Sequence, residues 1–112
     1  MTKSAIRMTI GERRYVAIPE EEWAQTLARA AGVELPAYPP RGKHGYPAVT
    51  TSRVSIAREI ISRRLAAGWT QDDLARRAGM RVETVSRLES AKHAPQAATV
   101  QRIDAAFKKA GV

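Results

Sequence analysis

The sequence predicts a mainly α-helical fold: a bundle of four or five short helices, preceded by a small β-hairpin and one further helix. From Val54 onward, apolar residues recur at the spacing of helix turns. Near the N-terminus, two short runs have the apolar character of strands, and a connection that contains Gly11 joins them. A stretch rich in proline and glycine lies between the two regions. We therefore expect an N-terminal unit over residues 1–32, a linker or wrapped loop over 33–52 and a helical domain over 53–112.

The N-terminal unit is expected to be a hairpin followed by a helix. Apolar side chains stand at every second position of residues 6–10, and a second apolar run covers residues 15–18. Pro19 and the three glutamates after it are typical of a helix start, and we place the end of that helix at Gly32. Because a lone hairpin is marginal in water, it must pack on this helix, pair across a dimer, or both.

Two aromatic residues of this unit, Tyr15 and Trp23, are expected in its core, with Trp23 on the same helix face as Leu27. If they are exposed instead, they would be natural anchors for a partner protein, since Trp and Tyr dominate interface hot spots. The N-terminal unit is thus a candidate for dimerisation or partner binding.

The helical domain shows the start and stop signals of successive helices. Apolar positions from Val54 to Leu65 predict a first helix that closes at Gly68. Thr70 followed by Asp73 is close to a capping box, which starts the next helix. The inward-facing residues of two later helices are expected to be Val85 and Leu88, then Val100, Ile103 and Phe107.

Composition favours an anionic partner. The chain has 19 Lys and Arg against 11 Asp and Glu, with most of the excess in residues 53–112, and basic side chains that meet phosphates release counterions. Without cysteine there is no disulfide or thiolate metal site, and His44 and His93 lack a ligand spacing. No apolar run is long enough for a membrane span or signal peptide. We expect a cytoplasmic protein without metal, cofactor or enzymatic activity.

Residues 69–89 carry the most informative pattern. Two short helices that meet at a steep angle need small residues where they approach, and Ala75 and Ala78 supply them. Gly79 suits the left-handed conformation of the turn between the helices. Apolar residues on one side would anchor the second helix, at about 82–91, and leave its other side free to contact base edges in the major groove.

This pattern resembles the phage-repressor, Cro-like helix-turn-helix family, often called XRE, over about half of the chain. The resemblance rests on Thr70-Gln71, Leu74-Ala75, Gly79, the run from Thr84 to Glu89, Lys92, Pro95 and Thr99-Val100. It implies a DNA-binding transcriptional regulator. Because one recognition helix reads only a few base pairs, it also implies a homodimer on an operator with an inverted repeat.

The resemblance implies roles for individual residues. Gln71 matches the residue that anchors a DNA phosphate and supports the recognition helix. The residues at base-contacting positions are Arg81, Val82, Glu83 and Arg87, and those in the loop that grips the DNA backbone are Ser90, Lys92 and His93. For each of them, an ordinary surface position is the alternative. Arg64 and Glu89 match a pair that commonly forms an internal salt bridge.

Two positions depart from the family pattern. Arg81 stands where a serine or threonine usually caps the recognition helix, so a cap that contributes about 1 kcal/mol is missing. Ala91 stands where glycine usually follows that helix, which puts the geometry of the next loop in doubt.

A second resemblance concerns the segment from Gly11 to Trp23. A short strand, a proline and an acidic helix start are similar to the N-terminal segment of many bacterial toxin–antitoxin antitoxins. This implies a repressor that regulates its own operator and binds a cognate toxin through its N-terminal region. The alternative is a protein-interaction module that keeps the fold without specific DNA binding. The outer face of the recognition helix, with Arg81 and Arg87, is net positive and argues mildly against that alternative.

Overall fold

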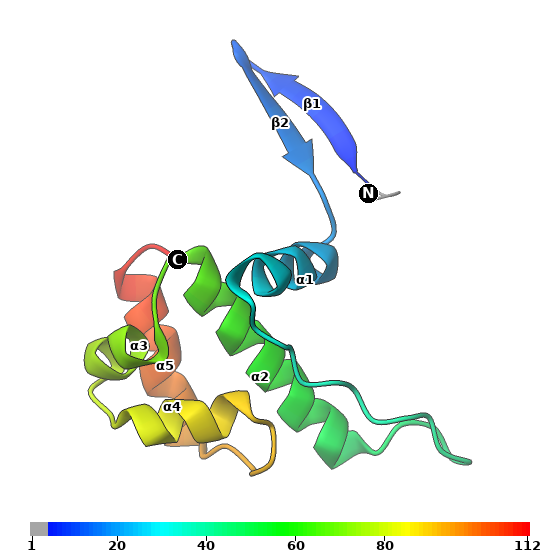
Figure 1. Ribbon diagram of the computed structural model, residues 1–112, viewed down its shortest axis with the longest axis vertical. Helices are drawn as coiled ribbons and strands as arrows, with labels where there is room; N and C mark the ends of the chain where they lie inside the picture. The colour runs from blue at the N-terminus through cyan, green and yellow to red at the C-terminus, as the bar shows by residue number, and fades with distance from the viewer. Residues whose placement is uncertain (1–4) are drawn as a thin grey trace.

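The computed structural model describes residues 5–112, which form a hairpin and five helices (Figure 1). In chain order these are β1 (Ile6–Ile10), β2 (Arg13–Ala17), α1 (Glu20–Ala31), α2 (Ala48–Ala66), α3 (Gln71–Ala78), α4 (Val82–Glu89) and α5 (Ala97–Lys109). The predicted fold class is confirmed: α2–α5 form the helix-turn-helix bundle, and the hairpin and α1 precede it. The first four residues of the predicted N-terminal unit lie outside the described part. Within residues 5–112, no helix is long and apolar enough to cross a bilayer.

The hairpin is tighter than predicted. Its strands pair antiparallel, with Met8 opposite Tyr15 and Ile10 opposite Arg13. The turn is therefore only two residues long and begins at Gly11, whose φ of 63° is easy for a residue without a Cβ. Both strands are exposed along their full length. The expectation that Tyr15 belongs to the core is wrong, because no other element covers this small sheet.

Helix α1 has the predicted bounds but buries a different face. It ends at Gly32, which takes the left-handed conformation, and its buried residues are Ala24 and Ala28. These small side chains allow α1 to lie close across α2 (Figure 1). Trp23 is 46% exposed, so its expected core position is wrong. The contact is made through alanines, and the indole instead lines a surface hollow beside α2.

The irregular segment is shorter than the predicted 33–52, because α2 already begins at Ala48. Pro47 stands directly before the first turn, where a residue without an N–H leaves no donor unpaired. The segment runs alongside α2 (Figure 1) and is held by Arg58, which donates to the carbonyl of Pro36 at 2.9 Å and lies over the ring of Tyr38. The segment is therefore a wrapped loop.

Arg58 also fixes α1 to α2. Its guanidinium forms an ion pair with Glu21 of α1. The residue is 9% exposed, and burial lowers the pKa of its guanidinium. One side chain of α2 thus holds both α1 and the segment that follows it.

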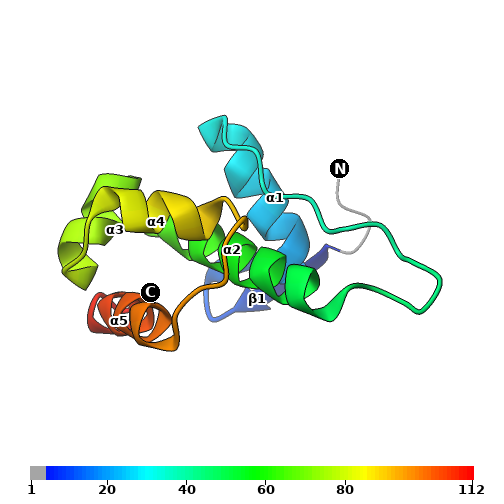
Figure 2. The same ribbon diagram turned by 90° about the horizontal axis from the view of Figure 1, so that it is seen from below.

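The main core lies between α2, α3, α4 and α5. Figure 2 shows α3 and α4 on one side and α5 on the other. Its buried members are Ile60, Leu74, Ala75, Ala78, Val85, Leu88, Ile103, Ala106 and Phe107. Trp69, on the connection between α2 and α3, stacks in parallel on Phe107 at a centroid distance of 5.5 Å. This places the start of α3 against α5.

The local signals at both ends of α3 are confirmed. The Thr70 hydroxyl accepts a hydrogen bond from the Asp73 amide at 3.1 Å, and the Asp73 carboxylate accepts one from the Thr70 amide at 2.9 Å. The hydrogen bond from the Thr70 amide to the carboxylate is the main cause that holds the pKa of Asp73 below its ordinary value. Gly79 ends the helix with a φ of 68°. The capping box and the glycine fix where α3 begins and ends.

Ala91 takes a positive φ of 60°, unlike every other residue of the described chain except glycines. In this conformation the Cβ lies close to the following carbonyl, which costs about 1–2 kcal/mol. The usual glycine is missing, but the turn keeps the geometry that a glycine would give.

We therefore expect Ala91→Gly to raise the free energy of unfolding by about 1 kcal/mol, because it removes this cost. Urea unfolding followed by circular dichroism measures the change. Ala110→Gly is the matched control, since Ala110 also follows a helix but has a φ of −88°. The control should be neutral or slightly destabilising, and equal effects of the two substitutions would contradict the prediction.

Candidate nucleic-acid interface

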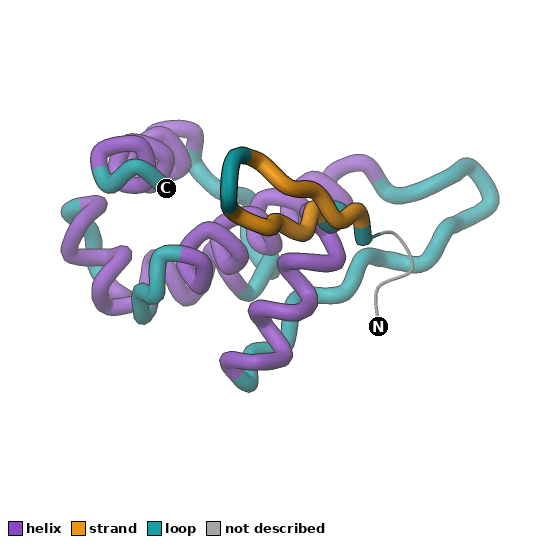
Figure 3. The backbone as a smooth tube through the Cα atoms, turned by 90° about the horizontal axis from the view of Figure 1, so that it is seen from above, coloured by secondary structure: helices purple, strands orange, loops and turns teal. Residues whose placement is uncertain are grey.

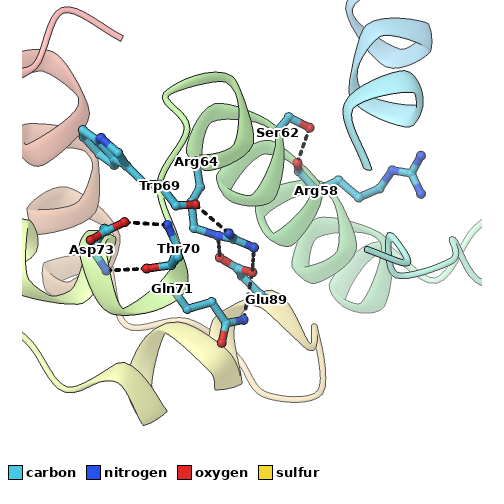
Figure 4. Close-up of polar contacts among 8 residues, drawn as sticks. All are labelled: Arg58, Ser62, Arg64, Trp69, Thr70, Gln71, Asp73 and Glu89. Carbon is cyan, nitrogen blue, oxygen red and sulfur yellow. Dashed lines mark hydrogen bonds and ion pairs between the residues drawn. The ribbon is translucent and has the colours of Figure 1, made fainter. Parts of the chain in front are cut away.

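A buried ion pair positions α4. The Arg64 guanidinium of α2 meets the Glu89 carboxylate of α4 through two hydrogen bonds, at 2.8 and 2.9 Å (Figure 4). The two side chains are only 7% and 5% exposed. A third hydrogen bond of Arg64, at 2.9 Å, goes to the carbonyl of Trp69. The predicted internal salt bridge is confirmed, and its fork geometry fixes the direction of α4 relative to α2.

Gln71 joins α3 to the same carboxylate. Its side-chain amide donates to Glu89 at 3.0 Å, as Figure 4 shows. Gln71 is half-buried at the first position of α3. The contact agrees with the expected support of the recognition helix, whereas its phosphate contact stays a prediction. α2, α3 and α4 therefore converge on Glu89.

The outer side of α4 presents three of the four predicted base-contacting residues on one surface. Val82, Glu83 and Arg87 line a shallow hollow together with Gln71. Glu83 and Arg87 are exposed, and Val82 is half-buried. The hollow combines a cation, an acceptor and a methyl-bearing side chain, which are the chemical types that contact base edges.

Ser86 completes this surface and was not predicted from the sequence. It is exposed and lines the same hollow. The signal was present, because Ser86 follows Val82 by four residues and Glu83 by three, so the three share a helix face. A hydroxyl there can donate or accept, so it suits either a base edge or a phosphate.

Arg81 precedes α4 and lies outside that hollow. It occupies the position before the first helical residue and makes no side-chain capping hydrogen bond. The missing cap inferred from the sequence is therefore confirmed. The first amides of α4 are left without a side-chain acceptor, and such a helix end attracts phosphate. An exposed arginine at this point adds positive charge to it.

The loop after α4 divides the remaining predicted residues. Ser90 and Lys92 are exposed. They line neither the hollow beside Val82 nor a second hollow between α4 and the start of α5. His93 lines this second hollow, where it joins Arg87. Arg87 thus lines both hollows. The contacts of Arg87, Ser90, Lys92 and His93 with DNA stay predictions.

Arg102 of α5 also lines the second hollow and was not identified from the sequence. Its guanidinium donates to the carbonyl of Gly79, in the turn between α3 and α4. The two residues are 23 positions apart along the chain, so no local sequence pattern predicts this contact. Arg102 therefore both restrains the turn and adds positive charge beside Arg87.

Comparison with known proteins agrees with the helix-turn-helix arrangement of α3 and α4. Residues 60–110 match a family model described as helix-turn-helix, which covers the region from the middle of α2 to the end of α5. No curated protein and no solved structure shows a significant match to the chain.

We expect Glu89→Gln to lower the free energy of unfolding by about 3 kcal/mol, because it leaves the Arg64 cation buried without a counter-ion. Urea unfolding measures this. Asp72→Asn is the control: it removes the same charge from an ion pair with Arg76 in which both side chains are about 70% exposed. We expect the control to change stability by less than about 0.5 kcal/mol. Similar losses in the two variants would show that the buried pair does not organise the bundle.

Proposed function

We propose that this protein is a sequence-specific transcriptional repressor that inserts α4 into the major groove. Support comes from the match of residues 60–110 to a helix-turn-helix family model and from the resemblance of the sequence to XRE regulators. The observation that supports the proposal most strongly is the surface shared by Gln71, Val82, Glu83, Ser86 and Arg87, held by the buried ion pair behind it. A rigid support lets the base-contacting side chains keep one geometry, which is what sequence discrimination requires.

In this proposal the residues have separate tasks. Arg87 donates a fork of two hydrogen bonds to O6 and N7 of a guanine, Val82 meets a thymine methyl group, and Glu83 accepts from a cytosine amine. Phosphates are bound by Gln71, Arg81, Ser90, Lys92 and His93. Phosphate contacts position the protein and add affinity on any sequence, whereas base contacts choose the site.

The protein acts as a cytoplasmic homodimer on an operator with an inverted repeat. One α4 reads only a few base pairs, so useful affinity and specificity need two half-sites about one helical turn apart. The net charge of +8 also favours binding to DNA, because basic side chains that meet phosphates release counterions.

We further propose that the protein is an antitoxin that represses its own operon and binds a toxin through its N-terminal half. Support comes from the surface of that half, where exposed Tyr15 and Trp23 offer the side chains that dominate protein interfaces. The helix-turn-helix unit would remain free to bind DNA while a toxin occupies the other end of the molecule.

The repressor proposal predicts that Arg87→Ala lowers the preference for the protein's own upstream DNA over random duplex by about 1–3 kcal/mol. Gel-shift titrations at two salt concentrations measure this preference. Arg29→Ala is the matched control, since it removes the same charge from an exposed position on α1. The control should keep the preference. Binding by the parent that is equal on both duplexes and lost at modest salt would overturn the proposal.

The antitoxin role predicts that a reading frame adjacent to this gene encodes a protein that stops growth when expressed alone. Co-expression of this chain should restore growth, and the Arg87→Ala variant should restore it equally, because toxin binding lies at the other end. Growth curves of the three strains measure the effect. Absence of growth arrest by either neighbouring frame would contradict the antitoxin role and leave the repressor proposal standing.

A further inference from the structure

The exposed apolar residues of this protein are concentrated at one end. Ten large hydrophobic side chains are exposed in the described chain, and half of them belong to the hairpin: Ile6, Met8, Ile10, Tyr15 and Val16. None lies between residues 50 and 111, where α3, α4 and α5 are found. The large apolar side chains of the helix-turn-helix unit are thus buried or half-buried, although the proposed function needs two copies to read an inverted repeat.

The hairpin sheet is unfinished. Among residues 5–112 it consists of β1 and β2 alone, and Figure 3 shows no third described strand beside either of them. Each outer edge carries backbone N–H and C=O groups without a partner strand, and a two-stranded sheet is only marginally stable. Native edges are usually protected by proline, glycine bulges or several charges, yet residues 6–10 contain one charge, Arg7, and neither proline nor glycine.

We propose that β1 pairs antiparallel with β1 of a second copy of this chain, with Met8 on the two-fold axis, to form a four-stranded sheet. The inference rests on the homodimer of the proposed function and names where its two copies join. An antiparallel pair centred on Met8 sets Ile6 opposite Ile10 of the other copy and Arg7 opposite Thr9. Apolar side chains meet apolar ones, and the two arginines are not opposite each other.

The sequence of β1 favours its own copy over other pairings. A shift of the register by one residue would place Ile6 opposite Thr9, and a shift by two in the same direction would place Arg7 opposite Arg7. The edge of β2 is a poorer candidate, because Arg13 and Arg14 would bring four arginines into the joined sheet. Pairing through β1 leaves those arginines on the outer strands, where solvent reaches them.

The joined sheet also has one mainly apolar face, in which Arg13, opposite Ile10, is the only charged residue. Met8 lies opposite Tyr15 within the hairpin, and side chains alternate between faces, so Ile6, Met8, Ile10 and Tyr15 project from the same side. Two copies double this face and add backbone hydrogen bonds at the centre. The hairpin then belongs to a sheet of four strands, which is enough for independent stability.

Disulfide formation tests the pairing, because the chain contains no cysteine. In Met8→Cys, the two Cα atoms on the axis would lie about 4.5–5.5 Å apart, within the range of a disulfide. Tyr15→Cys is the matched control: Tyr15 is on the same face and 43% exposed, against 40% for Met8. Its two copies would stand about 14 Å apart, three strand spacings away.

After mild oxidation of the full chain without DNA, we expect Met8→Cys to run as a dimer on a non-reducing gel and Tyr15→Cys as a monomer. Light scattering should give the parent twice the chain mass of 12.3 kDa. Met8→Lys should lose the dimer, because it sets two cations opposite each other on the axis, whereas Tyr15→Lys should keep it.

A monomeric parent, equal cross-linking of the two cysteine variants, or a dimer that survives Met8→Lys would overturn the pairing. A stronger cross-link in Tyr15→Cys would instead place the contact at β2. Failure here is separate from failure of the proposed function, because the preference for the upstream DNA and its loss in Arg87→Ala are measured on the cysteine-free chain.

Discussion

The buried ion pair between Arg64 and Glu89 organises the DNA-binding half of the molecule. Two charges in the interior carry a large desolvation cost, which is offset only when every donor and acceptor finds a partner. Here Arg64 donates to Glu89 and to the carbonyl of Trp69, and Gln71 donates to the same carboxylate. The pair therefore acts mainly as a geometric constraint. Its directional hydrogen bonds fix how α2, α3 and α4 lie relative to one another, whereas a non-directional apolar contact would fix this less tightly.

The outer face of α4 inherits its geometry from this constraint. Glu89 ends the helix whose exposed side carries Val82, Glu83 and Arg87, so the inner contact sets the direction in which these side chains project. A second restraint acts at the other end, where Arg102 of α5 donates to the carbonyl of Gly79 in the turn before α4. Both ends of α4 are thus tied to the bundle by arginines from other helices.

The long helix α2 carries both halves of the protein. Arg64 links it to the helix-turn-helix, while Arg58 links it to Glu21 of α1 and to the carbonyl of Pro36. The surfaces differ accordingly, because exposed apolar side chains gather on the hairpin and exposed cations dominate around α4. One end of the molecule is thereby suited to protein contacts and the other to phosphates and bases.

The sequence by itself determined the features that arise within one or two helix turns: the capping box at Thr70, the left-handed turn at Gly79, and the shared face of Val82 and Arg87. It also identified the pairing of Arg64 with Glu89, through the family pattern. Only the tertiary structure decided that α1 buries Ala24 and leaves Trp23 outside, that the hairpin stays uncovered, and that Arg102 reaches Gly79. The reason is physical. Caps and turns depend on neighbouring backbone atoms, whereas burial depends on which surfaces meet after the chain has folded.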